Sequence, residues 1–195
     1  MLWALGLAYF IGSVPSSFLL TRLFDGRDIR ELGSRNAGAT NVTLNVGWIP
    51  GLLTLLGDVG KGYVAAVIGR FAQAPICPYL TPAFAIAGHN WPVWLRFRGG
   101  GGLATFIGGA LALSQLPMVV VGFALWGISY LLCRNHDKSA VLACVLLPVV
   151  VLASRPPFKV LAFTTTSSFA VALKRLQSIR QKLKLAKAGS KKELP

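Results

Sequence analysis

The stretch LWALGLAYFIGSVPSSFLLT, residues 2–21, places twenty residues without a single charged side chain near the start of the chain. A predominantly apolar run of about 20 residues is long enough to cross the hydrocarbon core of a bilayer as one helix. No basic segment precedes it, and no small-residue cleavage site followed by a polar domain comes after it. We therefore interpret it as a retained transmembrane helix and not as a signal peptide.

The rest of the chain repeats this pattern. Of its 195 residues, 54% are hydrophobic and 13% are charged, whereas a soluble domain carries about 25% charged residues. The sequence predicts an all-α, polytopic membrane helix bundle of about seven transmembrane helices. Several segments are shorter than a full span, and Leu103–Leu113 has the alternative of a half-buried or re-entrant helix. The six further apolar segments are Trp48–Gly69, Tyr79–Leu95, Leu103–Leu113, Met118–Cys133, Ala140–Ala153 and Val160–Leu173.

The charges divide the loops into two groups. Lys and Arg outnumber Asp and Glu by 20 to 6, for a net charge of +14. We attribute this excess to loops that face anionic lipid, not to nucleic-acid binding. The loops on the opposite side of the membrane from the basic tail carry only Arg70, Arg155 and Lys159. The positive-inside rule therefore predicts an outside N-terminus and a cytoplasmic C-terminus. The loops on the predicted cytoplasmic side carry Arg22, Arg27, Arg30 and Arg35, then Arg96 and Arg98, then Arg134 and Lys138.

The chain divides at residue 173 into a membrane domain, residues 1–173, and a basic cytoplasmic tail, residues 174–195. We favour a topology anchor and lipid-surface helix for this tail over a specific partner site. The cysteines Cys77, Cys133 and Cys144 have neither disulfide nor metal spacing, so we interpret them as small apolar residues. We expect no metal and no cofactor.

Two glycine-rich loops fall on the predicted cytoplasmic side. The first, GSRNAGATN at residues 33–41, offers small residues whose backbone N–H groups can form a concave anion site, with an ordinary capped interhelical loop as the alternative. The second, FRGGGGLATF at residues 97–106, allows a ligand to approach the backbone closely beside Arg96 and Arg98, with a flexible linker as the alternative. Their shared side and chemistry predict that the two loops face one another across a pocket.

Three further polar patches interrupt the apolar segments. GDVGKG at residues 57–62 places Asp58 and Lys61 three positions apart within a span, which indicates either a functional pair or a structural ion pair. AGHNWPVW at residues 87–94 places His89 near the end of another span, as a packing or a catalytic residue. GSVPSS at residues 12–17 predicts a kink in the first helix.

Taken in order, GSVP, GSRNAGATN, DVGK and GHNWPVWLRFRGGGGLAT resemble the bacterial PlsY family of acyl-phosphate:glycerol-3-phosphate acyltransferases. The resemblance implies a seven-helix enzyme of the bacterial cytoplasmic (inner) membrane, with its active site near the cytoplasmic face. It implies transfer of a fatty acyl group from acyl phosphate to the 1-hydroxyl of glycerol 3-phosphate, which gives lysophosphatidic acid for phospholipid biosynthesis. It also implies membrane lipid as a partner and a soluble acyl-phosphate synthase as a further one.

The resemblance places the substrates at the glycine-rich loops and the polar span residues. Acyl phosphate is an activated mixed anhydride, so positioning and charge stabilisation suffice for transfer. We expect no covalent nucleophile, with His89 as the one catalytic candidate. The expected substrate-binding residues are Ser34, Arg35, Asn36, Gly38, Ala39, Thr40, Asn41, Asp58, Lys61, His89, Arg98, Gly99, Gly100 and Gly102.

The chain departs from the family pattern where the family has a glycine in the first loop and a lysine in the second. Here these positions hold Arg35 and Gly101, Leu44 replaces an arginine, and Arg175 and Ser178 stand near a usual His and Asn. We predict that Arg35 reaches across to the space beside Gly101 and binds a substrate phosphate. The alternatives are a catalytically silent paralogue, an enzyme for a related phosphorylated polyol, and a transporter based on the intramembrane Asp58–Lys61 pair.

Overall fold

The structure, a computed structural model, describes residues 1–190. Within that part the chain is all-helical, with nine α-helices and two short 3₁₀ turns, Ile29–Glu31 and Val93–Leu95. Each of the seven predicted apolar segments lies mostly in a helix. The helices are α1 (Leu2–Ser13), α2 (Ser16–Asp25), α3 (Ala39–Asn45), α4 (Trp48–Arg70), α5 (Cys77–Asn90), α6 (Leu103–Ala112), α7 (Leu116–Cys133), α8 (His136–Ala153) and α9 (Phe158–Ser190).

The first apolar segment is broken near its middle, as GSVPSS predicts. α1 ends at Ser13 and α2 begins at Ser16, directly after Pro15. Proline lacks the N–H that would continue the helical ladder, and its ring restricts the preceding residue to extended conformations. The break leaves the hydroxyl of Ser13 buried without a hydrogen-bond partner and directs the Ser13–Ser17 turn towards α4 and α5.

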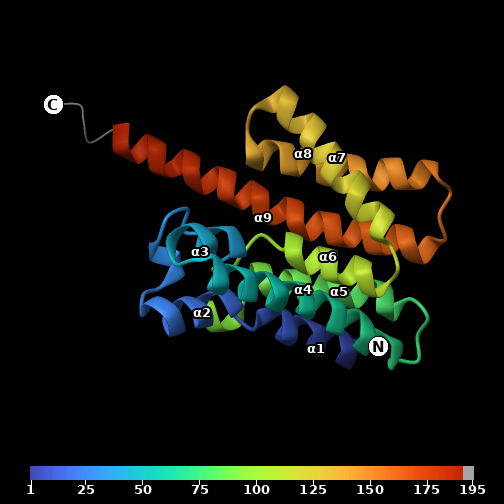
Figure 1. Cartoon of the computed structure of the whole chain (residues 1–195). Helices are drawn as coiled ribbons and strands as arrows, with labels where there is room; N and C mark the ends of the chain where they lie inside the picture. Colours follow the sequence, from blue (N-terminus) through green and yellow to red (C-terminus); the bar gives the residue numbers. More distant parts are fainter. Residues whose placement is uncertain (191–195) are drawn as a thin grey trace.

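The helices form a compact group with an attached hairpin (Figure 1). α1, α4, α5 and α6 pack against one another, α9 lies along α5, and α7 and α8 form a hairpin that reaches this group mainly through the contact of α8 with α9. The largest buried apolar cluster includes Ile86 of α5, Phe106 of α6 and Phe163 of α9. The rings of Phe106 and Phe163 stack with centroids 5.4 Å apart.

Glycines allow α4 and α6 to approach closely. A Cβ atom added at Gly62 would collide with the carbonyl of Thr105, and one added at Gly108 would collide with the carbonyl of Val59. Small residues at helix contacts let backbones approach within van der Waals distance, which is the main source of helix association in lipid. This contact brings the N-terminal end of α6 close to the polar centre of α4.

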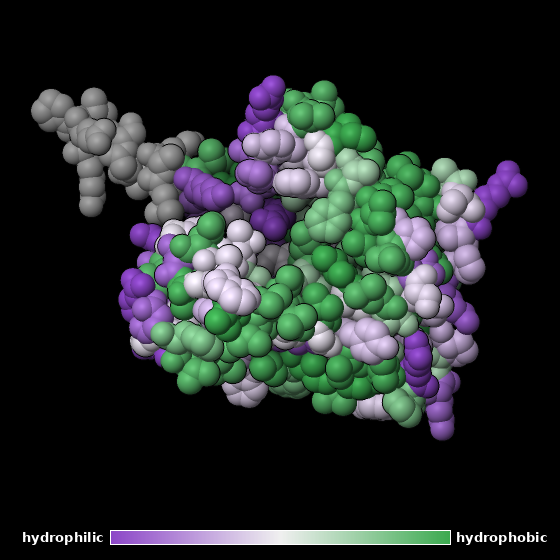
Figure 2. Space-filling view, viewed as in Figure 1, coloured by the Kyte–Doolittle hydropathy of each residue, from purple (hydrophilic) through white to green (hydrophobic). Residues whose placement is uncertain are grey.

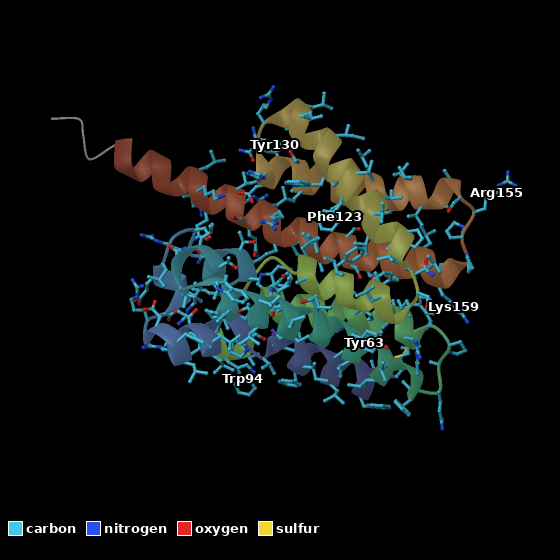
Figure 3. The ribbon with its side chains drawn as sticks, viewed as in Figure 1. Tyr63, Trp94, Phe123, Tyr130, Arg155 and Lys159 are labelled. Carbon is cyan, nitrogen blue, oxygen red and sulfur yellow. The ribbon has the colours of Figure 1, made fainter. Side chains whose placement is uncertain are left out.

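The two groups of basic loops lie at opposite ends of the molecule. Arg155 and Lys159 are at the end where α8 turns into α9 (Figure 3). Trp94 and Tyr130, which closely precede Arg96, Arg98 and Arg134 in the sequence, are at the other end. Figure 2 shows an apolar band between more hydrophilic ends on the face in view. The two groups of loops thus lie at opposite ends, as the positive-inside rule requires of loops on opposite sides of a membrane. The outside N-terminus and the cytoplasmic C-terminus stay predictions.

By length and composition, the described residues contain four helical segments able to cross a membrane: Leu2–Asp25, Trp48–Arg70, Leu116–Cys133 and His136–Ala153. Leu103–Ala112 is a shorter apolar helix, so the count of seven spans stays a prediction. The expected segment Tyr79–Leu95 is wrong at its end, because α5 stops at Asn90 before Pro92. α9 continues without interruption past residue 173, the predicted boundary of the tail.

Candidate active site

Asp58 is the centre of a buried polar cluster between α4 and α5. It is 2% exposed, and its carboxylate Oδ1 accepts a hydrogen bond from Lys61 Nζ at 2.7 Å. His89 Nδ1 lies 3.4 Å from the same oxygen. A buried carboxylate requires such partners, because an unpaired charge in this environment is very costly. Asp58 and Lys61 are one helical turn apart in α4, and His89 extends the pair to α5.

His89 connects this cluster to the four-glycine loop. Its imidazole packs on the backbone of Gly100, where an added Cβ atom would overlap Nε2. The same atom would lie 2.6 Å from the carbonyl oxygen of Ala37 in the first loop. Gly100 N–H also donates to the carbonyl of His89 at 3.1 Å. Only glycine fits at Gly100, since the imidazole and the first loop both close on it.

The two predicted loops therefore meet, as expected. Ala37 of the first and Gly99 and Gly100 of the second line one small cavity with Asp58, Lys61 and His89. The rest of the lining comes from the α1–α2 break and from Pro92 and Leu95. The cavity holds about 10 Å³, which is close to the space of one water molecule. Its lining combines charged side chains with apolar groups.

Asn41 holds the first loop together from within. Its amide nitrogen donates to the carbonyls of Ile29, Leu32 and Asn36 at 3.0–3.2 Å. Its amide oxygen accepts from Ser34 N–H at 3.1 Å and from the side chain of Asn45 at 2.9 Å. Asn41 is 4% exposed, so its whole side chain is used inside the protein. Asn41 therefore has an architectural role in the loop, and its expected role in substrate binding stays a prediction.

An ion pair in the segment before the first loop is connected to the segment before the second loop. Asp28 accepts from the guanidinium of Arg30, with the shortest contact at 2.6 Å. Arg30 Nη1 also donates to the carbonyl of Leu95 at 3.2 Å. The hydrogen bond from the Arg30 side chain holds the pKa of Asp28 below its ordinary value of 3.8, despite partial burial. The pair thus holds Leu95 beside the segment that precedes the first loop.

The expected site residues fall into two groups. Asp58, Lys61, His89, Gly99 and Gly100 line the cavity. The cavity is also lined by Ala37 and the Ser13–Ser17 turn, which were not among the expected substrate-binding residues. In the sequence, only the small residues of GSRNAGATN and GSVPSS pointed to them. The expected residues outside that lining are Ser34, Arg35, Asn36, Gly38, Ala39, Thr40, Asn41, Arg98 and Gly102.

The predicted exchange between Arg35 and Gly101 is wrong. Arg35 is exposed, and its backbone has a φ of 59°, a left-handed conformation that residues other than glycine rarely adopt. The guanidinium beside Gly101 belongs to Arg175 of α9, with Nη2 3.0 Å from the position of a Cβ atom at Gly101. In the part of the chain that the structure describes, no group of three or more His, Cys, Asp or Glu residues could hold a metal ion.

The fold and cavity define a multi-pass helical membrane protein whose polar site lies between two glycine-rich loops. The family profile described as glycerol-3-phosphate acyltransferase matches residues 2–184. The chain belongs to the glycerol-3-phosphate acyltransferase family, PlsY.

Relatives and solved structures agree with this assignment. Glycerol-3-phosphate acyltransferase 2 of Moorella thermoacetica is 35% identical over 193 residues, which cover 99% of this chain and 97% of the relative. Glycerol-3-phosphate acyltransferase of Desulforamulus reducens is 41% identical over 143 residues, 73% of this chain and 71% of the relative. The crystal structure of PlsY, an integral membrane glycerol 3-phosphate acyltransferase in its glycerol 3-phosphate form, aligns with a TM-score of 0.76 and 27% identity, over 94% and 92% of the two chains.

Proposed function

We propose that this protein transfers a fatty acyl group from acyl phosphate to the 1-hydroxyl of glycerol 3-phosphate at the bacterial cytoplasmic membrane. The observation that carries the proposal is the contact of His89 with both Asp58 and the glycine loop at Gly100. It joins a buried charge cluster to the four-glycine loop. The names of its relatives support glycerol 3-phosphate as the acceptor, and the resemblance in the motifs supports acyl phosphate as the donor.

In the proposed reaction the acceptor hydroxyl attacks the carbonyl carbon of the acyl phosphate. A new ester C–O bond forms, the bond from the acyl carbon to the phosphate oxygen breaks, and inorganic phosphate leaves. The hydroxyl proton ends on an oxygen of the departing phosphate, so no covalent acyl-enzyme is needed. The protein contributes positioning and positive charge, because the mixed anhydride is already activated.

His89 has a definite part in this scheme. Asp58 fixes one edge of the imidazole, and the other edge supports the backbone of Gly100. The imidazole thus sets the position of the glycine loop over the cavity. We propose that substitution of His89 lowers transfer because the loop no longer holds the substrate phosphate at the attack distance.

The test is acyl transfer by the purified full-length protein with acyl phosphate and radiolabelled glycerol 3-phosphate. We expect labelled lysophosphatidic acid with acyl phosphate and little with acyl-CoA, and we expect His89→Ala to reduce the rate at least ~10-fold, or about 1.4 kcal/mol of transition-state stabilisation. Lipid-facing Leu56→Ala is the matched control, since Leu56 is on α4 but 58% exposed. A wild-type protein that forms no lysophosphatidic acid would rule out the proposal, and equal rates with acyl-CoA would rule out the donor.

A further inference from the structure

Arg175 of α9 is a cation with an unused hydrogen-bonding edge. Its Nη1 lies 3.3 Å from Asp137 Oδ1. Its Nε is buried and has no hydrogen-bond partner within the described residues, and no protein acceptor is recorded for Nη2 there either. The Nε–Nη2 edge is the face of a guanidinium that binds carboxylate or phosphate with two parallel hydrogen bonds.

The free edge lies against the four-glycine loop. The position of a Cβ atom at Gly101 is 3.0 Å from Nη2 and 3.6 Å from Nε of Arg175. Gly101 directly follows Gly100, whose backbone contacts His89, and successive Cα atoms are about 3.8 Å apart. The guanidinium therefore lies about one residue along the loop from the cavity. Gly101 has no side chain, so the guanidinium can lie against its backbone.

The surrounding backbone also offers unused donors. Within the described residues, neither Gly101 nor Gly102 has its N–H bonded to a backbone carbonyl. α6 begins at Leu103 with no side chain capping its first turn. Beside Gly102, the side chain of Asn90 is 0% exposed and leaves Oδ1 without a partner. The place thus combines a guanidinium with free N–H groups, which are the donors that a phosphate needs; Asn90 Oδ1 is an acceptor and is not one of them.

Asp137 holds Arg175 in this position. The carboxylate is 8% exposed in the first turn of α8, and it accepts from Lys182 at 2.5 Å as well as facing Arg175. Two cations on one carboxylate leave a net positive charge beside the loop. The tether also reduces the conformational freedom that a long side chain would otherwise lose on binding a ligand.

We infer that Arg175, positioned by Asp137, binds the phosphate group of a substrate together with the N–H groups of Gly101 and Gly102. The inference rests on the proposed function for the identity of the substrates, glycerol 3-phosphate and acyl phosphate, but not for the phosphate chemistry. It assigns a cation from the last helix to a loop that has no cationic side chain of its own between Gly99 and Gly102. Arg175 is a binding residue and Asp137 a positioning residue.

The experiment measures binding without turnover, by calorimetric titration of the full-length protein in lipid nanodiscs with glycerol 3-phosphate and separately with inorganic phosphate. We expect Arg175→Ala to weaken the binding of both at least ~10-fold and Arg175→Lys to weaken it less, because one charge remains without the bidentate edge. Arg180→Gln is the matched control: it removes a guanidinium from the same helix, but Arg180 is exposed and takes no part in the contacts of Asp137. We expect it to bind like the wild type.

Steady-state kinetics identify the phosphate. A raised KM for glycerol 3-phosphate alone assigns Arg175 to the acceptor, and a raised KM for acyl phosphate alone assigns it to the donor. Asp137→Asn should raise the same KM less than Arg175→Ala does, with kcat changed little. If Arg175→Ala binds phosphate and shows both KM values like Arg180→Gln, the inference is wrong.

Gly101→Ala covers the case in which Arg175→Ala fails to fold. It keeps the guanidinium and its contact with Asp137 but places a methyl group 3.0 Å from Nη2, and we expect at least a ~3-fold weaker affinity for phosphate. An unchanged affinity in this variant would contradict the inference. If the wild type binds phosphate through Arg175 but forms no lysophosphatidic acid, the proposed function fails and the inference stands.

Discussion

His89 Nδ1 lies 3.4 Å from Asp58 Oδ1, so a residue of α5 shares the carboxylate that Lys61 binds one helical turn along α4. This relationship joins two helices through one buried anion and supports the glycine loop through the far edge of the imidazole. Because the three side chains are each less than a tenth exposed, none can exchange its partner for bulk water without opening the cluster.

Asp58→Ala should destabilise the protein by about 3–5 kcal/mol, because it leaves the Lys61 ammonium buried without a counter-charge. The measurement is thermal or denaturant unfolding in detergent micelles. Adding Lys61→Met to this variant should recover part of the loss, since the orphaned charge is then removed. A double variant less stable than Asp58→Ala would show that Lys61 stabilises the fold independently of Asp58.

Asn41→Ala should cost about 2–3 kcal/mol of folding free energy, because the carbonyls of Ile29, Leu32 and Asn36, buried or partly buried, and the Ser34 N–H lose their partner. Thr40→Ala is the control: Thr40 is the exposed neighbour, and surface changes of this kind stay within about 0.5 kcal/mol. Limited proteolysis of the loop reports the same difference. Equal stability of the two variants would mean that Asn41 is not the architectural centre of the loop.

The Asp28–Arg30 pair makes the free energy of unfolding depend on pH in the acidic range. The folded pKa of Asp28 lies below its ordinary value of 3.8, so its contribution is complete above that value and is lost as the pH falls through the folded pKa. We expect wild type to lose about 1 kcal/mol more than Asp28→Asn between pH 5 and pH 2, a size typical of a partly solvated pair. Parallel stability curves for the two proteins over that range would rule out the contribution.

Local features were predictable from the sequence, whereas most contacts between distant segments were not, the meeting of the two glycine-rich loops being the exception. Hydropathy located the helices because apolar length is a local property, and the three-residue spacing predicted the Asp58–Lys61 pair within one helix. The third partner, His89, depends on how α4 packs on α5, which no spacing records. α9 continues past residue 173 because Lys, Arg, Leu and Gln are good helix formers, so the change in polarity there did not mark a helix end.

The guanidinium beside Gly101 shows the same limit. Arg35 belongs to a glycine-rich loop and Arg175 to the basic segment after the last apolar run, and both are on the predicted cytoplasmic side. The sequence alone gives no reason to place Arg175 beside Gly101. The choice depends on backbone conformation and on Asp137, which lies 38 positions from Arg175 along the chain and still contacts it. Only the packing of α8 on α9 brings these two residues together.

The left-handed backbone of Arg35 leads to the last prediction. At a φ of 59° a residue with a Cβ atom is strained, whereas glycine adopts this conformation freely. Arg35 is exposed, and its side chain makes no hydrogen bond or ion pair with another described residue. Arg35→Gly should therefore stabilise the protein by about 0.5–1 kcal/mol and leave acyl transfer within a factor of ~2.

The measurements are thermal unfolding and the transfer assay on the same preparation. Arg35→Ala is the informative control, because it removes the guanidinium but keeps the Cβ atom and its strain. We expect its stability to match the wild type, so that the gain in Arg35→Gly is assigned to the backbone. If both variants lose transfer at least ~10-fold at unchanged stability, the guanidinium of Arg35 acts on a substrate, and its exposure in this conformation does not describe the working enzyme.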